Sequence, residues 1–282
     1  CTSDSMFELP LSKLEYLLDL CHIALQTRTS AHYIKHTGLH DVWFYPNGTQ
    51  PIIIKRYHQR WLQTFPSHAE QLIQAEQKTY SNPALSIIRA YPPSPIEMDS
   101  TLWCIYPFHR SSSPPNNAWH RVQALRKALQ TPLIKSYTPH PTPPLTSTQH
   151  QILSPIENAR KNLGDLAPLA HTHTTHRDLR PTNVIWIDQT PHAIDLEHTG
   201  PRALITDQLA LSIDWHQPWP RYTHTNTLKQ AQAALLDEWL LWLQQLLYLA
   251  PQDTKIESIF QKQCNTTFQV LKHNNQMASS SV

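Results

Sequence analysis

One short stretch of the chain, residues 175–186, constrains its fold and chemistry more than any other. It contains Asp178, then Asn183 five residues later, and then an apolar run and a turn that lead to a second acidic residue, Asp195. Phosphoryl transfer from a nucleotide needs such groups, because one carboxylate orients the attacking hydroxyl while a carboxamide and a second carboxylate hold magnesium against the phosphates. This set of groups therefore suits phosphoryl transfer from a nucleotide with the aid of Mg²⁺. In the alternative, Asp178 ends a strand and Asp195 caps a helix, and the spacing arises by chance.

The same residues resemble a known family. Residues 176–183 read HRDLRPTN, residues 194–197 read IDLE, and Asp207 follows Asp195 by twelve residues, beside an apolar helical run. Together these motifs resemble the aminoglycoside phosphotransferase and choline kinase family, a branch of the protein-kinase-like superfamily. The resemblance implies a kinase that phosphorylates a hydroxyl group of a small molecule.

The resemblance also implies a role for each matching residue. Asp178 would be the catalytic residue that accepts the proton of the acceptor hydroxyl. Arg180 could meet the γ-phosphate, or it could be a surface residue. Asn183 and Asp195 would be ligands of Mg²⁺, and Glu197 would reach a second metal ion through water.

Two more positions would be structural, since His176 would pack within the loop and Asp207 would tie the loop down.

Two other functions remain open: a protein Ser/Thr kinase, suggested by the HRDLRP wording, and a catalytically inactive nucleotide-binding module. The first is disfavoured because no Asp-Phe-Gly motif follows and the segment up to Asp207 is too short for an activation segment. The second is disfavoured because the motif residues are intact.

The N-terminal part is predicted to be an antiparallel sheet that binds the nucleotide. Residues 41–45 and 51–55 are strand-like, and Asn47-Gly48 between them is typical of a hairpin, because both residues tolerate positive φ. Lys55 ends the second strand, where the kinase lysine that contacts the α- and β-phosphates is expected. The alternative is a solvent-facing lysine at a strand end.

Other nucleotide-binding positions follow from the resemblance. Gly38 falls where the phosphate-covering loop is expected. A glutamate on the next helix should pair with the strand lysine, and Glu70 is preferred over Glu76 because it lies in the first part of that helix. Tyr106 and Phe108 lie at the expected hinge, where backbone groups meet the adenine.

The predicted fold class is α+β, a two-lobed protein-kinase-like fold. Residues 1–107 would form a nucleotide-binding lobe with a helix and an antiparallel sheet, and residues 108–282 a mostly helical lobe with the catalytic loop and the acceptor site. Residues 85–90 and 102–106 are expected to add strands to the sheet. Apolar periodicity predicts helices over residues 9–26, 67–78, 118–129, 149–163 and 228–249.

The acceptor site is expected just beyond the catalytic motifs. Asp214, Trp215 and Trp219 offer a carboxylate and two aromatic faces, which suit a cationic group. The predicted partner is thus a small molecule with a hydroxyl group, with cationic molecules such as choline, ethanolamine or aminoglycosides among the candidates. In the alternative, both tryptophans only cover the core.

Composition narrows the class of protein further. The formal net charge is +2, from 23 basic and 21 acidic residues, and no long basic run is present, so no nucleic-acid partner is expected. Polar residues interrupt the longest apolar run, so no membrane span is expected. The four scattered cysteines favour a reducing compartment, and we expect a cytoplasmic protein. Zinc binding by the histidines near position 173 is a weaker alternative, because no further ligands lie nearby.

Overall fold

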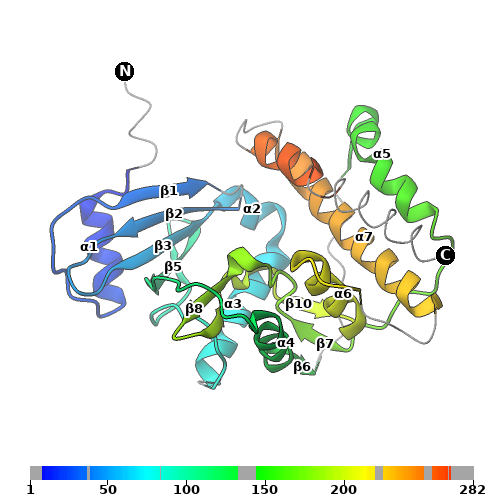
Figure 1. Cartoon of the computed structure of the whole chain (residues 1–282). Coiled ribbons are helices and arrows are strands. Elements are labelled where there is room, and N and C mark those ends of the chain that lie inside the picture. The colour runs from blue at the N-terminus through cyan, green and yellow to red at the C-terminus, as the bar shows by residue number, and fades with distance from the viewer. Residues whose placement is uncertain are drawn as a thin grey trace. The chain divides into compact units, whose positions relative to one another are not determined.

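The computed structural model describes residues 8–36, 39–82, 84–132, 144–219, 225–250, 256–265 and 267. The chain forms two compact units (Figure 1). The first contains the residues up to Leu129 together with Thr182–Thr199, and the second contains Gln130–Pro181 and the residues from Gly200 onward. This division differs from the predicted boundary after Pro107, because the first unit includes the next helix and also the segment that carries the predicted metal ligands.

The first unit is built on a five-stranded antiparallel sheet with the order β1-β2-β3-β5-β4. The strands are β1 (His32–His36), β2 (His40–Tyr45), β3 (Ile52–Tyr57), β4 (Ile96–Met98) and β5 (Thr101–Pro107). Strand β3 is central and pairs with β2 on one side and β5 on the other. The predicted hairpin at Asn47-Gly48 joins β2 to β3, with Gly48 at φ +56°.

Side chains alternate between the two faces of this sheet. On one face, Ile52 and Ile54 belong to an apolar core with Trp43 and Trp103, and helix α1 (Leu11–Leu20) contributes leucines to the same core. Lys55 has the opposite parity on β3 and is also buried. The central strand therefore presents Lys55 on the face that α1 does not cover.

Other elements of the first unit follow the sheet in sequence. They are α2 (Gln59–Thr64), α3 (Pro66–Ser81), α4 (Ala118–Leu129), β8 (Val184–Ile187), β9 (Thr190–Ala193), the 3₁₀ turn η3 (Leu196–His198), and the 3₁₀ turn η2 (Pro181–Asn183) apart from Pro181. Strands β8 and β9 form a hairpin, which α4 contacts through β9, while α3 packs against η3. The predicted strand over residues 85–90 is absent from the described structure; Ile87 instead makes a single bridge to Ala193.

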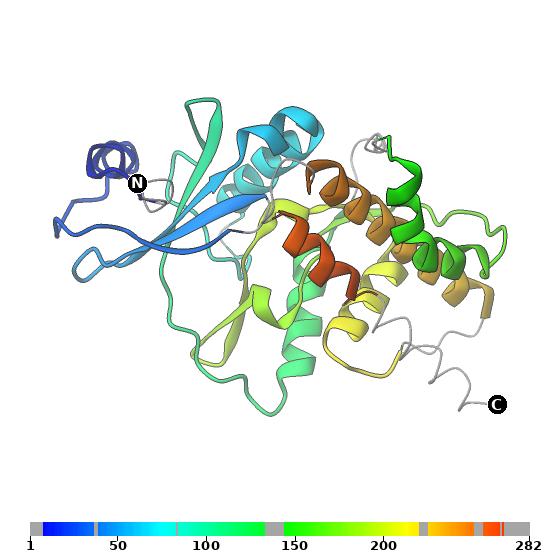
Figure 2. The same ribbon diagram turned by 90° about the horizontal axis from the view of Figure 1, so that it is seen from above.

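The second unit combines a small antiparallel sheet with packed helices. The sheet has the order β10-β7-β6, and the elements are β6 (Thr131–Pro132), α5 (Ser147–Lys161), β7 (His173–Thr175), β10 (Gly200–Arg202), α6 (Leu204–Asp214) and α7 (Thr225–Leu249). Helix α7 packs against both α5 and α6, and α5 and α7 lie side by side in Figures 1 and 2. Thr146 and Gln149 form a capping box that fixes the start of α5.

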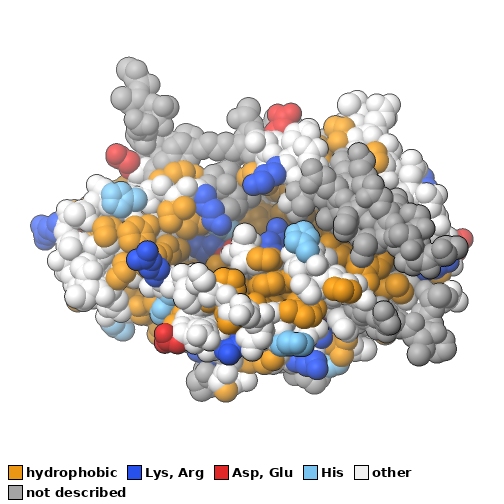
Figure 3. All heavy atoms as spheres, in the orientation of Figure 1, with side chains coloured by type: hydrophobic (Ala, Val, Ile, Leu, Met, Phe, Trp, Pro, Cys, Tyr) orange, Lys and Arg blue, Asp and Glu red, His pale blue; other side chains and the backbone are white. Residues whose placement is uncertain are grey.

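Two surface properties bear on function. The face shown in Figure 3 carries basic side chains interspersed with apolar and neutral polar ones rather than a continuous basic stripe. Over the described part of the chain, every helix is either too short or too polar to span a lipid bilayer.

Cys21, Cys104 and Cys264 are free thiols and are buried.

Candidate active site

The first unit gathers the predicted lysine and two of the predicted acidic residues around one buried charge. Lys55 is 4% exposed, and its Nζ atom contacts an oxygen of Asp195 and lies 3.0 Å from Oε2 of Glu197. Burial disfavours the charged form of a lysine, but the two carboxylates outweigh burial and raise the pKa of Lys55 above its ordinary value. The lysine is thus a fixed cation on the central strand.

Glu197 is held from several sides. The Tyr57 hydroxyl donates to Oε2 of Glu197 at 3.2 Å, and Nδ1 of His40 lies 3.5 Å from Oε1. Burial opposes the negative charge, but the charge of Lys55 outweighs burial and lowers the pKa of Glu197 below its ordinary value. Burial, aided by Lys55, lowers the pKa of His40 to about 3, so this imidazole is neutral at neutral pH. Glu197 is therefore an ionised carboxylate inside the unit.

The two predicted metal ligands, Asn183 and Asp195, lie close together. The Ile194 amide donates to the Asn183 carbonyl at 3.0 Å, which places the residue before Asp195 against Asn183. Asp195 has φ +61°, a left-handed conformation that is uncommon for residues other than glycine. A carboxamide and a carboxylate are oxygen ligands of the kind magnesium prefers, so this donor set fits Mg²⁺ with nucleotide phosphates as further ligands. The described residues contain no group of three or more His, Cys, Asp or Glu side chains that could hold a metal ion.

The two glutamates of α3 are placed opposite to our preference. Glu70 is exposed, whereas Glu76 is completely buried, and the Tyr106 hydroxyl donates to its Oε1 at 2.5 Å. Burial raises the pKa of Glu76 to about 7, while its hydrogen bond and the charge of Lys55 act in the opposite direction. The preference for Glu70 was wrong because the inner face of α3 carries Glu76.

The hinge positions are only partly available to a ligand. The Phe108 amide donates to the Pro51 carbonyl at 3.0 Å, and the Phe108 ring, 40% exposed, meets the Phe44 ring edge-on at 5.1 Å. The amide that follows β5 is thus already used within the sheet. Gly38 lies outside the described residues.

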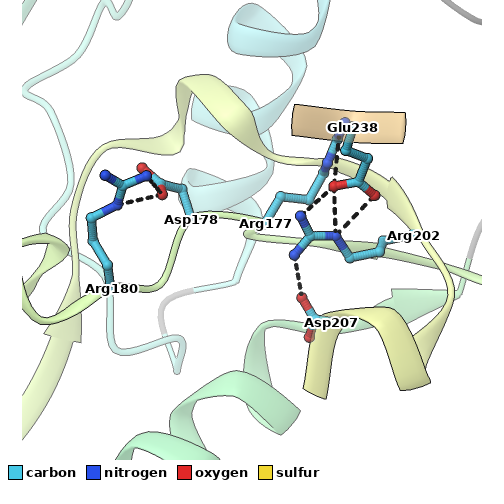
Figure 4. A network of polar contacts seen from close by, with 6 residues as sticks. All are labelled: Arg177, Asp178, Arg180, Arg202, Asp207 and Glu238. Atoms are coloured by element: carbon cyan, nitrogen blue, oxygen red, sulfur yellow. Dashed lines mark hydrogen bonds and ion pairs between the residues drawn. The ribbon is translucent and has the colours of Figure 1, made fainter. Parts of the chain in front are cut away.

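The second unit carries the predicted catalytic residue. Strand β7 leads into the buried His176 and then to Asp178, whose Oδ1 accepts a hydrogen bond from Nε of Arg180 at 2.6 Å (Figure 4). A second guanidinium nitrogen of Arg180 contacts the same oxygen, although the side chain is 41% exposed. Arg180 is therefore neither free nor distant, because it pairs directly with the proposed base.

A second polar network lies beside this pair, and Figure 4 shows both. Asp207, in the first turn of α6, accepts from Gln130 at 3.2 Å and lies 3.4 Å from Nη1 of Arg202. The Arg202 guanidinium also binds the carboxylate of Glu238 on α7, and Arg177 lies 3.4 Å from the same carboxylate. Burial opposes the charge of Glu238, but Arg202 and Arg177 lower its pKa to about 2. Asp207 was expected from the sequence to have a structural role, whereas no role was expected for Glu238.

The proposed acceptor residues have three different surroundings. The Trp215 indole N–H donates to the Leu179 carbonyl at 2.8 Å, so this ring is attached to the catalytic segment. Trp219 packs against the core of α6 and α7 around Leu209. Burial raises the pKa of Asp214 to about 6, with Asp178 acting in the same direction and Arg180 against it. Asp214 thus lies within electrostatic reach of the Asp178–Arg180 pair.

Comparison with known proteins gives structural likeness without close sequence relatives. No model of a protein family matches this sequence, and no curated protein matches it. Spectinomycin phosphotransferase APH(9)-Ia, solved with ADP and spectinomycin, has a TM-score of 0.59 at 12% identity, with 93% of this chain and 98% of that chain covered. A thermostable mutant of aminoglycoside phosphotransferase APH(4)-Ia in its apo form gives 0.55 at 11% identity, with 92% and 98% covered.

A third structure agrees with these two. Amicoumacin kinase hAmiN, in complex with AMP-PNP, Ca²⁺ and Ami, gives a TM-score of 0.51 at 13% identity and covers 94% of each chain. The predicted fold class, a sheet-based N-terminal part followed by a mostly helical part, is confirmed by these likenesses.

Proposed function

We propose that this chain, which has the fold of the aminoglycoside phosphotransferases and the kinases related to them, transfers the γ-phosphoryl group of ATP to a hydroxyl group of a small molecule. The observation that carries the proposal is the burial of Lys55 against Asp195. Burying the charge of a lysine in the centre of a sheet destabilises the fold unless an oppositely charged group lies beside it. Here its partners are the second motif's own acidic residues, 140 and 142 positions away in sequence.

Each polar group then has one task. Lys55 would bind the α- and β-phosphates of the nucleotide. Asn183 and Asp195 would hold Mg²⁺, which when bound neutralises charge on the phosphates. Asp178 would accept a hydrogen bond from the acceptor hydroxyl and take its proton late in the reaction. Arg180, already paired with Asp178, would keep a positive charge beside the transferred phosphoryl group.

The role of Glu197 is revised in this proposal. Glu197 was expected to reach a second metal ion, but its carboxylate is buried and already binds Lys55 and Tyr57. A carboxylate in that position contributes by fixing the orientation of the lysine. We therefore assign Glu197 to Lys55 and leave the metal to Asn183 and Asp195.

The acceptor is proposed to be a small alcohol that also carries an amino or quaternary ammonium group. Support comes from Asp214, a carboxylate near the Asp178–Arg180 pair. Trp219 lends no support, because it packs against the core. Trp215 is held by the Leu179 carbonyl and would form a wall of the site rather than a mobile contact.

The direct test is transfer from ATP in the presence of magnesium, screened over choline, ethanolamine, thiamine, homoserine, methylthioribose and several aminoglycosides, with a generic protein substrate included. We expect turnover with one small alcohol and none with the protein. Asp178→Asn should lower the rate at least about a hundredfold with an unchanged Tm, because the proton acceptor is lost and the shape is kept. Asp188→Asn, in the exposed β8–β9 turn, is the matched control. Phosphorylation of the generic protein substrate but of no small molecule would refute the proposal. Normal turnover by Asp178→Asn would also refute it.

A further inference from the structure

Glu238 lies in the centre of a charge network that reaches the residue next to the proposed base. Its carboxylate accepts from Nε of Arg202 at 3.1 and 3.2 Å and lies 3.4 Å from Nη2 of Arg177 (Figure 4). The side chain is 17% exposed, and that of Arg177 is 19% exposed. Glu238 comes from α7, sixty residues beyond Asp178 in sequence, so this contact ties a distant helix to the catalytic segment.

The segment around Asp178 is held on both sides of the base. Before it, β7 pairs with β10, with Arg202 opposite His173. After it, the Leu179 carbonyl accepts from the Trp215 indole. Between these two attachments, Arg177 has φ +65°, a conformation that an arginine adopts only when its surroundings impose it. The ion pair with Glu238 holds the Arg177 side chain in place.

Two arginines therefore flank Asp178, and each has a different carboxylate. Arg180 pairs with Asp178 itself, whereas Arg177 pairs with Glu238. Arg177 would lose its anion if Glu238 were neutral, and Asp178 is the acidic residue next to it in the chain. An additional guanidinium on the base would hold its oxygens away from an incoming hydroxyl.

We propose that Glu238 is a positioning residue for Asp178, which acts by holding Arg177 in its left-handed conformation and away from the base. The inference rests on the proposed function only in taking Asp178 as the base. The placement of the segment itself can be measured without any turnover.

The test uses the full-length protein and four variants. Glu238→Gln removes the charge and keeps the shape. Arg177→Met removes the other partner and leaves Glu238 bound to Arg202, so it should fold even if Glu238→Gln does not. The double variant tests whether the two residues act together. Asp237→Asn is the matched control, because Asp237 is the adjacent acid on α7, is 55% exposed and pairs with Arg160 instead.

Two readouts separate this inference from the proposed function. Amide hydrogen exchange of residues 176–179 should become faster in both single variants and stay unchanged in Asp237→Asn. Transfer should show kcat reduced about tenfold or more with KM for ATP within twofold, because a shift of about 1 Å at a reacting group can cost about 10²-fold. The kcat of the double variant should be no lower than that of the less active single variant.

Unchanged exchange in Arg177→Met, or additive losses of kcat in the double variant, would overturn the positioning role. An inactive wild-type protein would refute the proposed function, and the exchange measurement would still decide the role of Glu238.

Discussion

At the scale of single residues, the buried Lys55–Glu197 ion pair of the first unit should be sensitive to substitution of either partner. Both side chains are 5% exposed, and removing one partner of such a pair leaves the other as an uncompensated buried charge. Glu197→Gln should therefore weaken ATP binding, since Lys55 loses one of its two anions, while the magnesium requirement stays as in the wild type. Asp195→Asn should raise the magnesium requirement instead. Titrations of rate against ATP and against magnesium measure both effects.

Tyr57→Phe also tests whether Glu197 affects ATP binding or the magnesium requirement, and it should destabilise the fold less than Glu197→Gln. It removes one hydrogen bond to the ionised Glu197, worth about 1.5–3 kcal/mol, and leaves both charges in place. ATP affinity should fall slightly and the magnesium curve should not move. If Glu197→Gln shifts the magnesium curve as far as Asp195→Asn does, Glu197 is a metal ligand and our assignment is wrong.

Several residue placements were predictable and others were not. The motifs assigned Asn183 and Asp195 to one magnesium ion; the Ile194–Asn183 hydrogen bond places the two residues close together, and their binding of the ion stays a prediction. The choice between Glu70 and Glu76 failed because the two are six apart on one helix, and apolar spacing alone did not show which of them faces the sheet. Glu238 had a signal that was overlooked, an acid beside the apolar stripe of a long helix, where an unpaired charge would be costly.

At the scale of elements, the β2–β3 hairpin is locked to the segment that follows α1. Asn47 is fully buried; its Nδ2 donates to the Ala24 carbonyl at 2.9 Å and its Oδ1 accepts from the Gln26 amide at 2.7 Å. Asn47→Ala should lower the free energy of unfolding by ~1–2 kcal/mol, because two partly buried hydrogen bonds between the Asn47 side chain and the backbone are lost. Urea unfolding measures the loss, with Asn116→Ala, at an exposed position, as control. A loss under ~0.5 kcal/mol would show that water replaces the side chain.

The success of prediction also varied between elements. The hairpin was predicted because Asn47-Gly48 carries its own turn preference, and the helix over residues 118–129 was predicted at both ends because its apolar spacing is regular. The strand over residues 85–90 was wrong. Its hydrogen bonds go to Ala193, about a hundred residues later, and local sequence preference contains no information about such a partner. The two- and three-residue strands β6, β7 and β10 are too short to show alternation.

At the scale of the whole molecule, the two compact units differ from the predicted consecutive lobes for a related reason. Residues 182–199 lie late in the sequence, yet they belong to the unit that contains the N-terminal sheet. Lys55 with its two carboxylates, and α3 against η3, create this association through contacts between distant parts of the chain. A single boundary drawn from composition and loop positions divides the chain into two continuous segments. It cannot place a late segment such as residues 182–199 in the same unit as the N-terminal residues.

The stability of the whole molecule should depend on the titration of Asp214. Burial and Asp178 raise its pKa from the ordinary 3.8 to about 6, while Arg180 and Arg202 act against them. Between pH 4 and pH 6 the native state thus holds a proton that the unfolded chain releases, and the free energy of unfolding contributed by this group falls as pH rises through that window. Asp214→Asn, which resembles the protonated form, should match the wild type near pH 4 and exceed it by ~1–3 kcal/mol above pH 7. Calorimetric Tm values for both proteins from pH 4 to pH 8 measure the difference, with Asp188→Asn at an exposed position as the control. A gap between Asp214→Asn and the wild type that stays constant over this range would mean that Asp214 is ionised throughout, and its carboxylate would then be as available to a cationic acceptor at pH 4.5 as at pH 8.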